Sequence, residues 1–208
     1  MAHTQYVDKA DLKTYIGLSG TGQDTNIDNA INGASRQIDA ICGRYFYQDD
    51  SVNAKYYTPT NDYFLFTDDI STTTGLIVQL DTTDDGTYDK TLTLDTDFTL
   101  KPFNPKQHKI SDTTYYWPHT ELEILATRSS ERFDKLIQKN IKIQAKFGWS
   151  AIPEAISQAT LIQATRLWKR KDTPFNVFGN EQTGQQELFS KMDPDAKELI
   201  KGYIKRKL

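Results

Sequence analysis

The stretch FGWSAIPEAISQATLIQATRLWKRKDTPF, residues 147–175, carries a clear helix start and a basic helix end, and it decides the fold. Pro153 and Glu154 favour a helix start, because proline suits a first turn and a carboxylate suits the positive end of the helix dipole. The basic residues Lys169 to Lys171 suit the negative end of the dipole. The sequence therefore predicts a helix over residues 152–168.

Apolar residues fall on two sides of this predicted helix when successive residues are rotated by 100°. The longer stripe, which we expect to pack on the predicted helix over residues 25–42 and to form the core, consists of Ile152, Ala155, Ile156, Ala159, Ile162 and Leu167. Leu161 and Trp168, with Ala164 nearby, lie roughly opposite. Because large exposed apolar patches are rare on monomers, this second strip needs a cover. Either a β-rich region of the chain or another subunit could supply it, and we favour assembly.

Two shorter helical patterns precede this stretch. The first runs over residues 8–16, with Asp8 as the expected cap and Gly17 as the stop. The second runs over residues 25–42, where apolar residues recur at helical spacing. Thr25 and Asp28 resemble a capping box at its start. A last helix is predicted from Asp193-Pro194 onward, after the link GNEQTGQQ at residues 179–186.

Between these helices the sequence has the character of an antiparallel β region. Residues 128–140 resemble a loop, and the other runs are short, rich in β-branched and aromatic residues, and broken by Asp, Asn, Gly and Pro. The runs, six or seven expected strands, are YYT (56–58), YFLF (63–66), GLIVQL (75–80), KTLTL (90–94), FTLK (98–101), ELEIL (121–125) and IKIQAKF (141–147). The predicted fold is therefore α+β: a small antiparallel core of about four helices with a β subdomain inserted between the second and third. The expected divisions are residues 1–47, 48–147 and 148–208.

Composition limits the classes of protein that need consideration. The 208 residues carry a net charge of −3, and no run is long and apolar enough for a membrane span. The N-terminus lacks the apolar core of a signal peptide, and the single Cys42 cannot form an internal disulfide, so a cytoplasmic origin is expected. We expect Cys42 to be a small buried hydrophobe. Charge is segregated: residues 49–97 hold eleven Asp and two Lys, whereas residues 161–208 hold ten Lys or Arg and six acids.

The acidic run DTTDDGTYD, residues 81–89, is the motif that most resembles a metal site. Asp81, Asp85, Gly86 and Asp89 match positions of a calcium loop, but the twelfth position is Leu92 instead of glutamate, and the flanks are strand-like. We favour a hairpin turn, in which Gly86 supplies the positive φ. The histidines form no ligand pair, no catalytic motif is present, and the sequence therefore indicates neither an enzyme nor a cofactor.

The sequence Trp168-Lys169-Arg170-Lys171 mixes an aromatic ring with cations, as nucleic-acid contacts do. A dedicated DNA-binding protein is usually more basic than a chain with a pI of about 5.6. We therefore favour packing of Trp168, with the cations at the C-terminus of the helix.

Several segments of the chain, taken in order, match the pattern of a known protein family. They are YVDKADLKTYIGL, a helix ending in ICGRYF, DDGTYDKTL with DFTLKPFN, KIQAKFGWSAIPEAISQATLIQATRLWKRKDTPFNVFG, and DPDAKELIKGYI. Together they resemble the head–tail connector (adaptor) proteins of tailed bacteriophages and related gene-transfer particles. The resemblance covers most of the chain. The FGW–IPEAI–LWKR block and the final helix are its most specific parts, while the β insertion matches more loosely.

The resemblance implies a virion structural protein without catalytic residues or cofactors. Members of this family form a ring, typically of twelve subunits, beneath the portal, and join the filled head to the next neck, stopper or tail protein. The expected partners are the portal, the downstream protein and further copies of the chain, while genome DNA passes through the ring without sequence-specific binding. The chain would be made in the host cytoplasm and located at the head–tail interface of the virion.

Three sets of site residues are expected. The subunit interface is the second strip, Leu161, Ala164 and Trp168. The final helix, about residues 194–206, is expected to dock on the portal without being needed for folding, through Leu199, Ile200, Tyr203, Ile204, Lys205 and Arg206. The segment 173–190 is expected to meet the channel or the downstream protein through Phe175, Asn176 and Phe178. The alternative from another class is a monomeric β-rich module that binds calcium or carbohydrate through its acidic loops, with an enzyme third.

Overall fold

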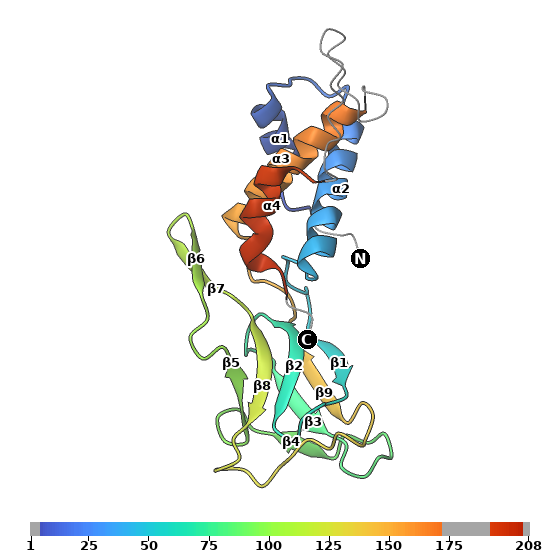
Figure 1. The fold of residues 1–208 in the computed structure, drawn as a ribbon, viewed down its shortest axis with the longest axis vertical. Coiled ribbons are helices and arrows are strands. Elements are labelled where there is room, and N and C mark those ends of the chain that lie inside the picture. The colour runs from blue at the N-terminus through green and yellow to red at the C-terminus, as the bar shows by residue number, and fades with distance from the viewer. Residues whose placement is uncertain (1–4, 172–191, 206–208) are drawn as a thin grey trace. The chain divides into compact units, whose positions relative to one another are not determined.

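The computed structural model describes residues 5–171 and 192–205 (Figure 1). Within these residues the chain forms two helices, then nine strands, then two helices. The predicted α+β class, with the strands between the second and third helices, is therefore confirmed. Contacts divide the chain into two compact units, one of residues 1–46 with 152–208 and one of residues 47–151.

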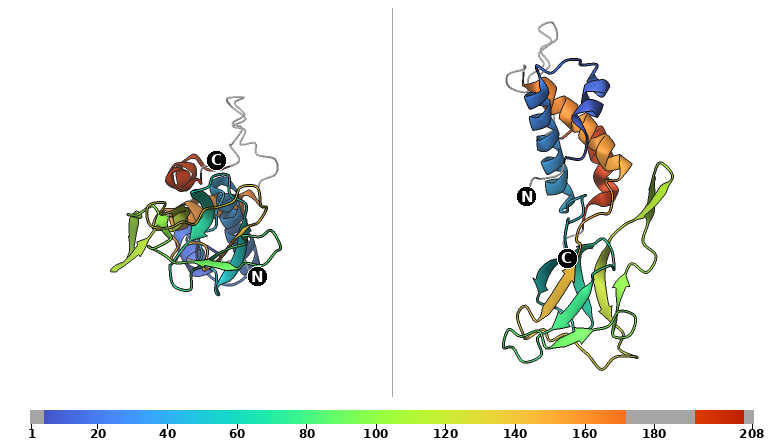
Figure 2. Two further views of the ribbon diagram at one scale, coloured as in Figure 1. Left: turned by 90° about the horizontal axis from the view of Figure 1, so that it is seen from below. Right: turned by 180° about the vertical axis from the view of Figure 1, so that it is seen from behind.

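The helical unit is organised around one central helix. Its elements are α1 (Lys9–Ile16), α2 (Asp24–Cys42), α3 (Glu154–Arg170), α4 (Pro194–Ile200) and a 3-10 turn, η2 (Lys201–Tyr203). The helix α3 packs against each of the other three, and α1 also packs against α2 (Figure 2). Because three helices surround α3, apolar and small residues are needed on more than one of its sides. No helix in the described part of the chain is long and apolar enough to cross a bilayer.

The capping box predicted at the start of α2 is wrong. The helix begins at Asp24, so Thr25 lies inside its first turn, and no side chain caps it. Asp28 instead forms an ion pair with Lys9 of α1, and the Nζ of Lys9 lies 2.8 Å from the Oδ2 of Asp28. Asp24 forms ion pairs with Lys9 and Lys13, which are both in α1. The hydrogen bond from Lys13 lowers the pKa of Asp24. The acids in the first turns of α2 therefore connect it to α1.

Other helix ends follow the sequence signals more closely. Gly17 and Gly43 end α1 and α2 in the left-handed conformation, as predicted. Asp193 caps α4, because its side chain accepts hydrogen bonds from two backbone N–H groups of the first turn. Asp8 is the N-cap residue of α1, but its side chain makes no capping hydrogen bond. Pro153 precedes α3 as its N-cap residue instead of lying in the first turn.

The β unit forms two larger sheets and one hairpin. The strands are β1 (Asn53–Tyr57), β2 (Phe64–Ile70), β3 (Ile77–Leu80), β4 (Lys90–Leu92), β5 (Phe98–Lys101), β6 (Gln107–Ile110), β7 (Thr113–Tyr116), β8 (His119–Ile124) and β9 (Ile141–Ala145). The sheet orders are β1-β9-β3-β4, β2-β8-β5 and β6-β7, and every pairing is antiparallel. All seven predicted runs form strands. The hairpin β6–β7 lies outside them, so the expected strand number was too low.

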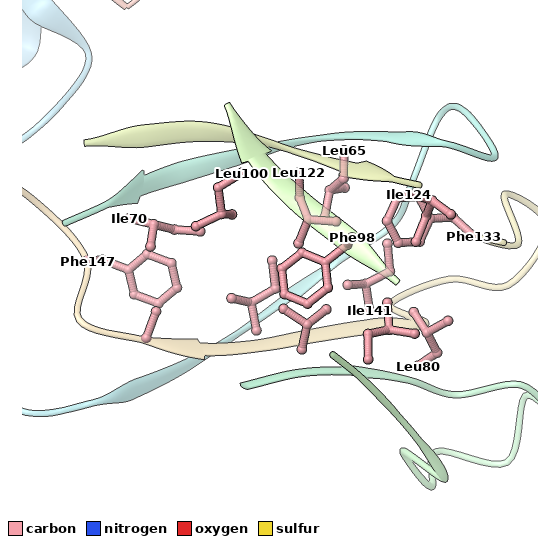
Figure 3. Close-up of a cluster of buried hydrophobic side chains, with 14 residues drawn as sticks. Leu65, Ile70, Leu80, Phe98, Leu100, Leu122, Ile124, Phe133, Ile141 and Phe147 are labelled. Carbon is pink, nitrogen blue, oxygen red and sulfur yellow. The ribbon is translucent and has the colours of Figure 1, made fainter. Parts of the chain in front are cut away.

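One apolar core lies between the two larger sheets (Figure 3). Alternation along β9 buries Ile141, Ile143 and Ala145 and leaves the two residues between them partly exposed. Phe98 of β5 lies among the side chains of this core, between the two sheets (Figure 3). The segment between β8 and β9 contains no helix or strand, in agreement with the loop predicted over residues 128–140. It nevertheless buries Phe133 in the same core. Full burial of one such side chain stabilises the fold by about 1.5–3 kcal/mol.

Candidate assembly surfaces

The second apolar strip of α3 is covered by the chain's own helices. Ala164 is completely buried in a cluster with Leu12 of α1 and Ile27 of α2. Leu161 and Trp168 pack, partly buried, against the same cluster. The strip therefore needs neither the β region nor another subunit to hide most of its surface. Ala164 has no free surface for a neighbouring subunit, whereas the assignment of Leu161 and Trp168 to a subunit interface stays a prediction.

A polar residue of α3, Gln163, was not singled out from the sequence. It is completely buried, and its side chain joins α3 to two other helices. Its Nε2 donates to Oε1 of Gln37 on α2 at 2.8 Å, and its Oε1 accepts from the backbone N–H of Asp193 at 3.0 Å. Both ends of the amide are thus satisfied, as burial of a polar side chain requires. The sequence signal that could have indicated this buried side chain is a glutamine between two apolar residues of the helix, Ile162 and Ala164.

The predicted portal-docking residues divide into buried and exposed members. Ile200 is completely buried, so it belongs to the core of the helical unit and offers no docking surface in this conformation. Tyr203 is partly buried and contacts the ring of Phe46 edge-on, with centroids 5.8 Å apart. Leu199 and Ile204 keep 36% and 42% of their surface exposed. These two residues are the apolar members of the set that a partner can reach.

A backbone hydrogen bond also joins the segment after η2 to the end of α2. The N–H of Lys205 donates to the carbonyl of Cys42, at the end of α2, over 2.8 Å. The helix α4 itself ends at Ile200, earlier than the predicted 206, and continues as the 3-10 turn η2. Arg206 and the predicted channel residues Phe175, Asn176 and Phe178 lie outside the described residues.

Cys42 is completely buried at the end of α2. Burial raises the pKa of its thiol to about 12. The thiolate is therefore scarcely populated near neutral pH, and the predicted role as a small buried hydrophobe is confirmed.

The acidic stretch 81–89 forms the connection of the β3–β4 hairpin, as predicted. Its carboxylates accept hydrogen bonds from the loop itself: Asp81 from the N–H groups of Thr83 and Gly86, and Asp89 from the N–H and hydroxyl of Thr82. The bonds from Thr82 lower the pKa of Asp89. The described residues contain no group of three or more acids, histidines or cysteines placed to hold a metal ion.

His108 and His119 lie on different strands, and His3 is outside the described residues. His119, in β8, is half-buried, and this burial lowers its pKa. His108, in β6, stacks on Tyr115 of β7 with ring centroids 5.6 Å apart. The same side chain lies 6.1 Å from the ring of Trp149, which is buried and in turn contacts Trp117. An isolated two-stranded hairpin is only marginally stable, so these aromatic contacts support β6–β7 against the rest of the β unit.

Exposed phenylalanines mark the outer face of the β2-β8-β5 sheet. Phe64, Phe66 and Phe103 expose 37%, 50% and 63% of their surface. The Nζ of Lys101 lies 4.8 Å from the ring centroid of Phe64 and 5.4 Å from that of Phe103. The same Nζ pairs with Glu123 at 2.6 Å. Contiguous exposed apolar side chains of this kind are typical of protein interaction surfaces. The available signal in the sequence was the unbroken apolar run YFLF at residues 63–66, which places apolar side chains on both faces of the strand.

The overall fold is similar to that of a chain from the neck of a GTA particle. No protein-family model matches the chain, and no curated protein matches its sequence. A chain of the solved structure described as "Neck of empty GTA particle computed with C6 symmetry" is similar in fold, with a TM-score of 0.50 and 12% identity. The match covers 97% of this chain and 90% of that chain, so both units are included. At 12% identity this similarity establishes the fold alone.

Proposed function

We propose that this protein is a structural component of the neck of a phage-like particle, and that it acts there as a head–tail adaptor. The fold similarity to a neck chain over 97% of this chain carries the proposal. The sequence resemblance to connector proteins supports it independently, because it rests on quoted motifs in the same order along the chain. In this role the protein forms a ring beneath the portal and joins the head to the next neck or tail protein.

The surface of the chain supports a role in assembly. The exposed phenylalanines of the β unit and the exposed Leu199 and Ile204 at the end of the helical unit are apolar surfaces on two separate units. A subunit between two different partners and two neighbouring copies needs several such surfaces. A ring of twelve subunits, as the resemblance implies, is compatible with the sixfold symmetry used for the similar neck.

The test is binding of the purified full-length chain to the portal protein of the same particle. We expect light scattering of the mixture to show a complex whose mass corresponds to a portal with a ring of this chain, and electron microscopy to show added density beneath the portal. A chain that stays monomeric in the presence of portal contradicts the proposal. If that monomer also binds calcium at micromolar concentration or an oligosaccharide, the alternative of a β-rich binding module is the correct one.

A further inference from the structure

A groove on the helical unit is lined by acidic, aromatic and apolar side chains. Its volume is about 480 Å³, and it lies between α1 and the N-terminal half of α3. Tyr6, Val7 and Leu161 contribute an apolar lining. Asp8 and Asp11 line the same groove, and both are exposed. Among the described residues, neither of these two carboxylates forms an ion pair.

An aromatic ring completes the set of groups. Tyr15, which also lines the groove, exposes 50% of its surface. A guanidinium group binds carboxylates through its N–H groups and stacks on aromatic rings, and the methylenes of its stem pack on apolar surface. The groove offers each of these three contacts. A negative rim around an apolar lining therefore favours a cationic occupant with a long side chain.

The same unit carries such a side chain at the other end of α3. Lys169 and Arg170 are exposed in its last turn, and neither forms an ion pair within the described residues. A helix rises 1.5 Å per residue, so Arg170 lies about 14 Å along the axis from Leu161 and about 20 Å from Ser157, which both line the groove. Arg170 is therefore too far away to fill the groove of its own chain.

We propose that the groove of one copy accepts Arg170 of a second copy, with Lys169 beside it at the rim. The charge complementarity between Asp8 and Asp11 on one surface and these cations on another carries the inference. Because the two surfaces differ, the contact is head-to-tail, and repetition of such a contact closes into a ring when the rotation permits. The inference rests on the proposed function, since it identifies the contact between neighbouring subunits of the ring.

Disulfide trapping tests the contact in the full-length chain. A chain with Asp11→Cys and Arg170→Cys should form a ladder of covalent oligomers under mild oxidation, alone at high concentration or on the portal. The buried Cys42 makes the wild type a low background. The matched control combines Asp11→Cys with Lys201→Cys, because Lys201 is also exposed but lies on η2. A ladder no stronger than this control overturns the pairing.

Charge reversal provides a second measurement. Arg170→Glu and Asp11→Lys should each weaken self-association, or ring formation on the portal, by about ten-fold or more, because like charges then face each other. The double variant should recover most of the loss, and thermal melting should confirm that each variant is folded. If a ring forms on the portal but these changes and the cysteine pair have no effect, the pairing is wrong and the proposed function stands. If no oligomer forms even with portal, both proposals fail.

Discussion

The side-chain amide of Gln163 donates a hydrogen bond to Gln37 across the α2–α3 contact, with Nε2 and Oε1 2.8 Å apart. The carbonyl end of the same amide accepts from the backbone N–H of Asp193, the N-cap residue of α4. A single buried side chain therefore links the start of α4 to both longer helices. Hydrogen bonds of this kind are directional, whereas the surrounding apolar contacts are not.

Gln163→Leu should destabilise the helical unit by about 1–3 kcal/mol, because it leaves the N–H of Asp193 and the Oε1 of Gln37 without this partner at little change in volume. Urea denaturation followed by far-UV circular dichroism measures the difference. Gln37→Leu is the matched control and should cost less, since Gln37 is partly exposed and its partner keeps the bond to α4. Equal stability of Gln163→Leu and wild type would show that the three-helix link contributes nothing.

The C-terminal helix should be required for stability, contrary to what its sequence alone suggested. Ile200→Ala should cost about 2–5 kcal/mol, as expected for truncation of a buried isoleucine. Leu199→Ala is the neighbouring exposed control and should change the free energy of unfolding by no more than about 0.5 kcal/mol while weakening portal binding. Thermal melting and a portal pull-down separate the two effects. A chain truncated after residue 193 that melts as cooperatively and as high as wild type would contradict this assignment.

The elements of the fold could be predicted because their signals are local. The run IKIQAKF alternates with a period of two and forms β9, and Gly17 and Gly43 end their helices in the left-handed conformation that glycine adopts most easily. The hairpin β6–β7 lacks such a pattern. Its ring contact with the rest of the β unit, from His108 to Trp149, joins residues more than thirty positions apart in the chain.

The surfaces could not be predicted to the same extent, because exposure is a property of the packed chain. The periodicity of α3 identified two apolar sides but not what covers them. Its cover comes from Leu12 and Ile27, in α1 and α2. In the same way, Ile200 and Leu199 have similar side chains and adjacent positions, yet only the packing of α4 on α3 decides which of them a partner can reach.

The β3–β4 loop should show acid sensitivity without tight calcium binding. Hydrogen bonds from Thr82 hold the pKa of Asp89 below its usual 3.8 in the folded state. A group with a lowered folded pKa stabilises the fold above its unfolded pKa, and this contribution is lost as the pH falls through the folded value. NMR titration of Asp89 should therefore give a midpoint below 3.8, and Asp89→Asn should reduce the pH dependence of stability in this acidic range.

Calcium titration should detect no site tighter than about millimolar, because the carboxylates of this loop already accept hydrogen bonds and the glutamate of a calcium loop is absent. A micromolar site that Asp85→Ala abolishes would show that the loop rearranges around a metal ion.

Trp168 is the residue for which folding and assembly have to be separated experimentally. The indole packs, partly buried, on the cluster between α1 and α2, so Trp168→Ala should destabilise the monomer by less than the roughly 3–5 kcal/mol of a fully buried tryptophan. Ile156→Ser, which places a hydroxyl at a completely buried position, should destabilise it more. Melting of both purified variants gives the order, and incorporation of the folded Trp168→Ala chain into particles tests assembly. A folded variant that fails to join particles would place the exposed part of Trp168 in an interface. Normal incorporation would restrict its role to the packing of α3 on α1 and α2.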